Sequence, residues 1–216
     1  MKYISYILLL SCAVAVSQQR VSKHFFSDKL TVHINASGLD EVLLEESRTE
    51  AFEIILLDEH INAHQIQLED LNDDLKIEFI QPFSTDKSAI FRKFITRRIH
   101  RASVIIKVPK NKVLFVYGGH VDVISKSYHG DINIFIDKGL VNLHDVQRNA
   151  TVKLFQGHVI AHLSNTAINI VSKYGDITVN TVHHDALYQL ENTSSSHEFN
   201  IESLHANVNV QYGLRK

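Results

Sequence analysis

Two similar stretches carry the main information about the fold: "ISKSYHGDINIF" at residues 124–135 and "VSKYGDITVN" at residues 171–180. Each contains Ser-Lys, then a Tyr, then Gly-Asp-Ile, and each ends in a run where polar and apolar residues alternate. Alternation of this kind in β-branched residues predicts a β-strand with one buried face. The repetition indicates that the chain builds the same structural unit several times.

The unit recurs from Val121 to the end of the chain. In each unit two apolar residues flank one residue that we expect to face outward, at Val121/Val123, Ile132/Ile134, Val141/Leu143, Val152/Leu154, Val159/Ala161, Ile168/Ile170, Ile177/Val179, Tyr188/Leu190, Phe199/Ile201 and Val208/Val210. A small residue stands two places before most of these pairs, as at Gly119, Gly130, Gly139, Gly157 and Gly175. A small residue at that position predicts a sharp corner between strands.

The sequence therefore predicts an all-β fold, a single-stranded parallel β-solenoid with short strands and an irregular β cap at its N-terminus. An antiparallel β-sandwich, with turns every ~8–12 residues, is the alternative. We expect one domain over 28–213. Its part 28–115 would supply the first coils and the cap, and its part 116–213 the regular repeats. Residues 18–27 would form an exposed segment before it.

The N-terminus predicts export. Residues 1–17 contain one Lys, an apolar run and the small pair Ala15 and Ser17, which is typical of a cleaved signal peptide. Two alternatives are an uncleaved membrane anchor and lipidation at Cys12, the only cysteine. Cleavage would leave a chain without disulfides, located in the periplasm, at the cell surface or in the medium, and not integral to a membrane.

Composition excludes several classes of function. The net charge of −2 gives no general attraction to nucleic acid, so we expect no nucleic-acid partner. There is no Trp, and no aromatic sugar-stacking site is obvious. The fourteen His residues lack metal-ligand spacing, and we interpret those near turns as solvated rather than as a metal-binding column. We expect no cofactor, no metal and no catalytic residue. Asp122, Asp131 and Asp176 recur with the repeat, which favours hydrogen bonding in turns.

Two sets of residues are candidates for binding. The first is a basic segment at 90–101, in which Phe and Ile alternate with five cations, Arg92, Lys93, Arg97, Arg98 and Arg101. Arg pairs with phosphate and carboxylate, so this segment predicts binding to an anionic lipid or polysaccharide that weakens with salt. A solvated loop that balances nearby acidic stretches is the alternative.

The second set is a row of asparagines at outward positions of the strands: Asn133, Asn142, Asn169, Asn200 and Asn209. Asn is depleted in ordinary strands, so a specific role favours it here. Stacked amides can form a hydrogen-bonded ladder along the axis. The same flat, uncharged face is also a candidate glycan-binding surface.

The strand–Val108–Pro109–strand segment, "GDINI" and "GDITV" resemble the bacterial putative-adhesin family of the head GIN domain type. The resemblance covers 28–213 and is clearest over 102–213. It implies a right-handed parallel β-helix and an exported or envelope-associated protein, and it supplies no catalytic residues. The many His residues and the basic segment depart from the family pattern.

Together these observations predict an exported, non-enzymatic, adhesin-like or structural module of the cell envelope that binds a glycan or an anionic envelope component. The alternative is a small polysaccharide-acting β-helix lyase or hydrolase. Such an enzyme needs carboxylates that converge on one groove.

Overall fold

The computed structural model describes four stretches of the chain, residues 19–58, 64–80, 102–192 and 195–213. Within these stretches there are sixteen β-strands and no helix, which confirms the predicted all-β class. The described part accordingly contains no helix of the length and hydrophobicity that crossing a bilayer requires. The predicted signal peptide and the basic segment 90–101 lie outside the described residues.

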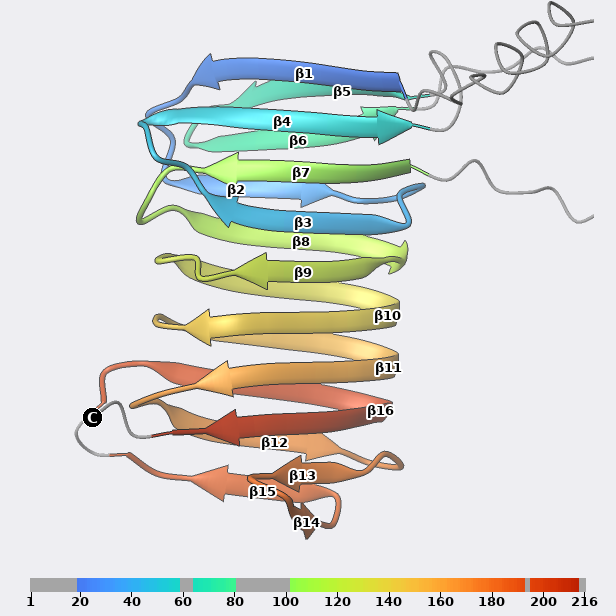
Figure 1. The fold of residues 1–216 in the computed structure, drawn as a ribbon, viewed down its shortest axis with the longest axis vertical. Helices are drawn as coiled ribbons and strands as arrows, with labels where there is room; N and C mark the ends of the chain where they lie inside the picture. Colours follow the sequence, from blue (N-terminus) through green and yellow to red (C-terminus); the bar gives the residue numbers. More distant parts are fainter. Residues whose placement is uncertain (1–18, 59–63, 81–101, 193–194, 214–216) are drawn as a thin grey trace, which may run out of the picture.

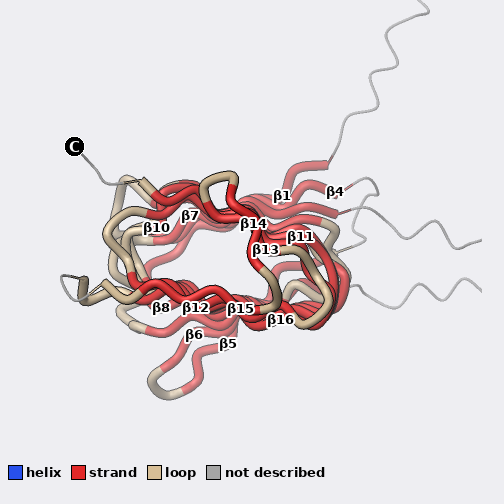
Figure 2. Tube along the Cα trace, turned by 90° about the horizontal axis from the view of Figure 1, so that it is seen from below, coloured by secondary structure: helices blue, strands red, loops and turns tan. Residues whose placement is uncertain are grey.

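The strands form two layers that enclose a hydrophobic core (Figures 1 and 2). The first layer contains, in spatial order, β5 (Gln65–Leu71), β6 (Asp74–Ile80), β2 (Thr31–Asn35), β8 (Val113–His120), the first halves of β10 (Asp131–Val146), β11 (Ala150–Leu163) and β16 (Glu198–Tyr212), then β12 (Ala167–Ser172) and β15 (Leu187–Leu190). The second layer contains β1 (Gln19–Phe26), β4 (Ala51–Asp58), β7 (Ala102–Val108), β3 (Glu41–Glu46), β9 (Asp122–Lys126), the second halves of β10, β11 and β16, then β13 (Ile177–Val179) and β14 (Val182–His184).

The centre of the stack is regular and parallel. In β10, Ile132 pairs with Ala150 of the following level, and Val141 pairs with Val159. The preceding level obeys the same spacing, because Val141 also pairs with Val123. Each level of this central part therefore repeats the chain after 18 residues.

The two ends of the stack depart from the prediction. β16 comes last in the sequence, yet it lies between β11 and β12. Likewise β2 and β3 lie between the level of β6 and β7 and the level of β8 and β9. The outermost pairs, β1–β4, β4–β7, β5–β6, β12–β15 and β13–β14, are antiparallel. The sheet is mixed, so a solenoid of parallel strands in sequence order is not confirmed.

The alternation of apolar residues predicted the core. Both members of nine of the ten predicted pairs are buried. The exception is Tyr188 and Leu190, which are partly exposed. They lie on β15 at the end of the first layer, where β12 is the one partner that the described strands provide, so no described strand flanks its outer edge.

Two of the predicted corner glycines, Gly139 and Gly157, are required where strands pass between the layers. Gly139 and Gly157 pair in register and have φ angles of 154° and 145°. A Cβ on Gly157 would lie 1.9 Å from the carbonyl oxygen of Gly139, and a Cβ on Gly139 would lie 2.0 Å from that of Val121. Gly119 differs, because its Cβ would lie 3.6 Å from the nearest atom, in Asp137. Close backbone approach therefore explains Gly139 and Gly157 but not Gly119.

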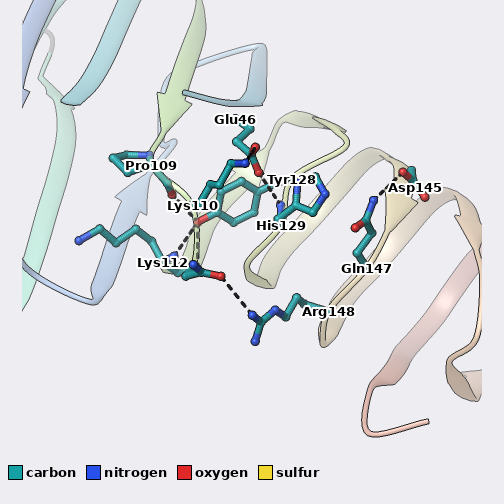
Figure 3. Close-up of polar contacts among 10 residues, drawn as sticks. Glu46, Pro109, Lys110, Lys112, Tyr128, His129, Asp145, Gln147 and Arg148 are labelled. Carbon is teal, nitrogen blue, oxygen red and sulfur yellow. Dashed lines mark hydrogen bonds and ion pairs between the residues drawn. The ribbon is translucent and has the colours of Figure 1, made fainter. Parts of the chain in front are cut away.

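One edge of the stack consists of turns that lie above one another (Figure 3). Tyr128 is 2% exposed, and its hydroxyl accepts a hydrogen bond from the Lys112 amide at 3.0 Å. The same hydroxyl can donate to the carbonyl oxygens of Lys112 at 2.9 Å and Pro109 at 3.2 Å. Burial raises the pKa of Tyr128 far above its usual range, so the hydroxyl keeps its proton. The turn after β7 is thereby fastened to the turn after β9.

A second contact at this edge joins β3 to the turn of Tyr128. The imidazole of His129 lies 2.6 Å from Glu46, and Lys110 lies 3.4 Å from the same carboxylate (Figure 3). Burial alone would raise the pKa of Glu46, but its contacts with His129 and Lys110 outweigh burial and lower it. Glu46 is therefore an ionised structural contact and not a proton donor.

The predicted role of the recurring aspartates in turns is confirmed for two of them. A carboxylate oxygen of Asp122 accepts a hydrogen bond from the Leu140 amide at 2.8 Å. Asp131 accepts one from the Asn149 amide at 3.2 Å. Each bond connects one level to the next and satisfies a backbone donor at the corner.

Residues 19–26 form β1, which pairs antiparallel with β4 along its whole length. The segment expected at 18–27 as an extension before the domain is thus an edge strand of the second layer. Phe25 of β1 packs against the edge of the core, where its ring stacks on that of Phe52 with centroids 5.0 Å apart.

Candidate functional site

Four aromatic rings stack on the outer side of the first layer. They belong to His33 on β2, Phe115 and Tyr117 on β8, and Phe135 on β10. Each ring has at least one buried apolar neighbour in its strand, such as Val32, Val116 and Ile134, so these side chains point away from the core. The centroids of His33 and Phe115 lie 5.0 Å apart, and those of Tyr117 and Phe135 lie 5.6 Å apart, with near-parallel ring planes. We call this set the aromatic ladder.

The register of the strands creates the aromatic ladder. Phe115 pairs with His33 across β8 and β2, and Tyr117 pairs with Phe135 across β8 and β10. Strands in a sheet lie ~4.8 Å apart, which is the distance at which rings stack in an offset arrangement. Tyr117 is 39% exposed, so the surface of the ladder is accessible.

An amide row continues the aromatic ladder along the stack. Asn133, Thr151, Asn200 and Asn169 follow Phe115 in register on successive strands. The amide of Asn133 donates to a backbone carbonyl at 3.3 Å, and that of Asn200 to Glu198 at 3.4 Å. Among the described residues no hydrogen bond joins two of these three asparagines, although the Asn169 side-chain oxygen accepts one from Gln189 on β15 at 3.2 Å. An amide has two N–H donors and an oxygen acceptor, so one bond each leaves further groups for a ligand.

The other end of the ladder has a charged rim. His33 lies 3.2 Å from Asp74, and Glu78 accepts hydrogen bonds from Asn35 and Lys76, both at 3.1 Å. The bonds from Asn35 and Lys76 lower the pKa of Glu78. A glycosidase needs a carboxylic acid whose pKa is raised, so that it can protonate a leaving group. Glu78 lacks this property.

A groove lies beside the Phe135 end of the ladder. Its volume is about 470 Å³, and its lining includes Phe135, Lys153, Phe155 and Glu202. Phe155 is 55% exposed, and Lys153 forms an ion pair with Glu202 at 2.6 Å. The groove therefore extends the accessible aromatic surface from β10 to β11.

The five predicted asparagines do not form one face. Asn133, Asn169 and Asn200 lie in the amide row on the first layer, whereas Asn142 and Asn209 lie on the second layer with Ile160 between them. The separation arises because β10 and β16 each cross from the first layer to the second. Each of these two strands therefore contributes one asparagine to each layer. The expectation of a single polar face is therefore corrected.

Asn209 lines a second hollow, at the strand ends of the second layer. This pocket measures about 690 Å³ and includes Asp145, His162, Asn180 and Tyr212. The Nδ1 atom of His162 is buried and has no hydrogen-bond partner among the described residues. The side chain of Asn180 is already bonded to the backbone of Tyr212 at 2.7 and 2.9 Å. Part of this lining therefore holds the fold together.

Other predicted sites are not placed by the structure. The five cations Arg92, Lys93, Arg97, Arg98 and Arg101 lie outside the described residues. Within the stretches that the structure describes, no group of three or more His, Cys, Asp or Glu residues could hold a metal ion.

Sequence reasoning missed the aromatic ladder. The absence of Trp argued against an aromatic sugar site, although Phe and Tyr provide similar faces. The available signal was spacing: Tyr117 and Phe135 are separated by the same 18 residues as Gly139 and Gly157, and each pair is in register. Aromatic residues at equivalent places in neighbouring levels must stack.

No family model matches the sequence, and no curated protein matches it. Among solved structures, a putative cell adhesion protein from Clostridium sporogenes has a TM-score of 0.66 and 13% identity, over 91% of this chain and 100% of that chain. This similarity shows a shared fold. It also confirms, at the level of the fold, the resemblance to bacterial adhesins that the sequence carries.

Two further solved structures are more distant. A putative adhesin from Bacteroides fragilis has a TM-score of 0.33 and 12% identity, over 91% of this chain and 98% of that one. A putative lipid binding protein from Parabacteroides distasonis has a TM-score of 0.25 and 10% identity, over 91% and 96%. At these scores neither structure adds to the argument.

Proposed function

We propose that the protein is an exported, non-enzymatic, adhesin-like module that binds a glycan along the aromatic ladder and the amide row. The observation that carries this proposal is the ladder itself, because four stacked rings on an outer sheet face contribute little to the core. Aromatic rings pack on the apolar faces of sugars, and amides donate to and accept from sugar hydroxyls. The fold shared with a protein described as a cell adhesion protein supports an adhesive role.

At the His33 end of the ladder, the state of the two carboxylates favours binding over polysaccharide cleavage. Asp74 and Glu78 are paired with His33, Asn35 and Lys76. A lyase or hydrolase needs an unengaged acid or base within reach of the bound sugar. Neither carboxylate meets this requirement.

Export is part of the proposal and has its own test. If residues 1–17 are a signal peptide, mature protein recovered from the producing cell begins near Gln18. Intact-mass measurement of the purified protein checks this, and a species that retains Met1–Ser17 would contradict export by cleavage.

We expect Tyr117→Ala/Phe135→Ala to weaken glycan binding by at least ~10-fold, which corresponds to ~1.4 kcal/mol. Both side chains lie outside the core, so the variant should remain folded and lose only the ~1 kcal/mol that a cross-strand aromatic pair contributes. The measurement is a glycan-array screen of the wild-type protein, followed by titration calorimetry with the best oligosaccharide.

The matched control is Phe26→Ala. Phe26 is 79% exposed and lies on β1 in the second layer, so this variant removes an exposed ring without touching the ladder. It should bind as the wild type does. Undiminished binding by the ladder variant, or equal loss in both variants, would refute the proposed site.

The basic segment is a second candidate contact, and ionic strength separates it from the ladder. Stacking and amide hydrogen bonds on a neutral sugar depend little on salt, whereas binding through Arg97, Arg98 and Arg101 should weaken steeply. Affinity that disappears in high salt, and in a variant with these three residues replaced by Ser, would assign binding to the basic segment instead.

A further inference from the structure

The outer side of the second layer carries an apolar stripe. Ile55 on β4, Ile105 on β7, Leu43 on β3 and Ile124 on β9 are successive neighbours in register. Ile105, Leu43 and Ile124 are partly exposed, and Ile55 is 4% exposed. Figure 1 views the four strands from this side, where they lie next to one another. The stripe is confined to these strands, because the next residues in the row are Ser22 on β1 and Asn142 on β10.

A charged row runs beside the apolar stripe on the same four strands. In the order β4, β7, β3, β9 it consists of Glu53, Lys107, Glu45 and Lys126, so the sign of the charge alternates. Lys107 pairs with Glu53 at 2.7 Å, and Lys126 pairs with Glu45 at 3.2 Å. The contact with Lys107 lowers the pKa of Glu53, so this carboxylate is ionised at neutral pH.

We propose that a second copy of this chain packs against this face, related by a two-fold axis parallel to the strands and located between β7 and β3. This axis places β4 opposite β9 of the second copy, and β7 opposite β3. Glu53 then faces Lys126 of the second copy, and Lys107 faces Glu45. In the apolar stripe, Ile55 likewise faces Ile124 of the second copy, and Ile105 faces Leu43. Such an isologous interface uses one self-complementary patch on both chains.

The third outward row on these strands fits the same axis. It consists of Leu57, Ser103, Glu41 and Asp122. Glu41 faces Ser103 of the second copy, and Asp122 faces Leu57, so no like charges meet. A two-fold axis along the stack would instead place Glu45 opposite Glu41. The alternative axis would also place Lys126 opposite Asp122, which offsets part of this repulsion, but only the axis parallel to the strands leaves no like charges facing each other on these four strands.

The size of the patch suits a dimer. Six strands, from β1 to β10, face their counterparts, and at ~4.8 Å per strand the contact is ~25–30 Å long. Because the aromatic ladder is on the other layer, the dimer would present two ladders on opposite outer surfaces. Two binding faces on one particle gain avidity toward a repeating glycan.

The test is sedimentation or light-scattering mass measurement of the purified full chain, supported by charge-reversal variants. We expect the wild type to be a dimer of the 24.6 kDa chain at micromolar concentration. Glu53→Lys and Lys126→Glu should each be monomeric, because each brings like charges together twice in the homodimer. Lys153→Glu, a charge reversal on the first layer, should remain dimeric.

The decisive sample is an equimolar mixture of Glu53→Lys and Lys126→Glu. In the heterodimer the two substituted side chains face each other with opposite charges. The unchanged Lys126 of one chain likewise faces the unchanged Glu53 of the other, so dimer mass should return. Within each chain the new charge repels its former ion-pair partner: Lys107 in Glu53→Lys, and Glu45 in Lys126→Glu. Mixing does not change these contacts, so recovery of the dimer cannot arise from improved folding. A monomeric wild type, dimeric single variants or a mixture that stays monomeric would overturn the proposal.

Discussion

Gly157→Ala is expected to destabilise the protein by several kcal/mol, roughly 3–5, or to prevent folding. The added Cβ would lie 1.9 Å from the carbonyl oxygen of Gly139, which belongs to the backbone of the adjoining level and cannot rotate away. The φ angle of 145° is one that residues with a Cβ rarely adopt. Equilibrium denaturation followed by circular dichroism measures the effect.

Gly119→Ala is the matched control. It introduces the same methyl group in β8, but the new Cβ would lie 3.6 Å from the nearest atom, an ordinary contact distance. We expect a change of at most ~0.5 kcal/mol. If both variants unfold at the same denaturant concentration, close packing between levels does not explain the corner glycines.

Ile177→Asp is the second large effect that we expect. Ile177 lies on β13 and is 0% exposed, so the substitution places an unpaired carboxylate in the core. Burying a charge without a partner costs several kcal/mol and forces either protonation or local unfolding. The loss of stability should be largest at neutral pH, where the new carboxylate is ionised, and should be measured there.

Asn169→Asp introduces the same carboxylate at an exposed position on β12. The Asn169 side-chain oxygen accepts a hydrogen bond from Gln189 at 3.2 Å, and a carboxylate can accept that bond equally well. The expected change is below ~1 kcal/mol. Similar melting shifts for the two aspartate variants would show that the assignment of inward and outward residues is wrong.

The sequence was sufficient to predict what depends on local pattern. Alternation placed Ile134, Val152 and Val159 in the core, where all three are 0% exposed. The glycine column predicted corners, and Gly139 and Gly157 lie where strands pass between the layers. These features follow from the pleat of a strand and from the space at a turn, which are set by neighbouring residues.

The order of the levels could not be predicted, because it depends on pairing between distant segments. The pair Ile168/Ile170 looks like any other unit, yet its strand lies beyond β16 at the end of the stack. Nothing in the local pattern distinguishes a parallel neighbour 18 residues away from one much further along the chain. The same limit concealed the aromatic ladder, since His33 meets Phe115 only because β2 is placed beside β8.

The position of β16 restricts how such a chain can assemble and change in length. Ala150 on β11 pairs with Phe199 on β16. During synthesis β11 therefore cannot complete its pairing until β16 has been made, although β12 follows it directly in the sequence. Contacts between distant segments slow folding, and a chain shortened before β16 would lose a level from inside the stack and leave two unpaired edges. A longer homologous chain should carry its extra levels between Val113 and Leu163, where the spacing is uniform.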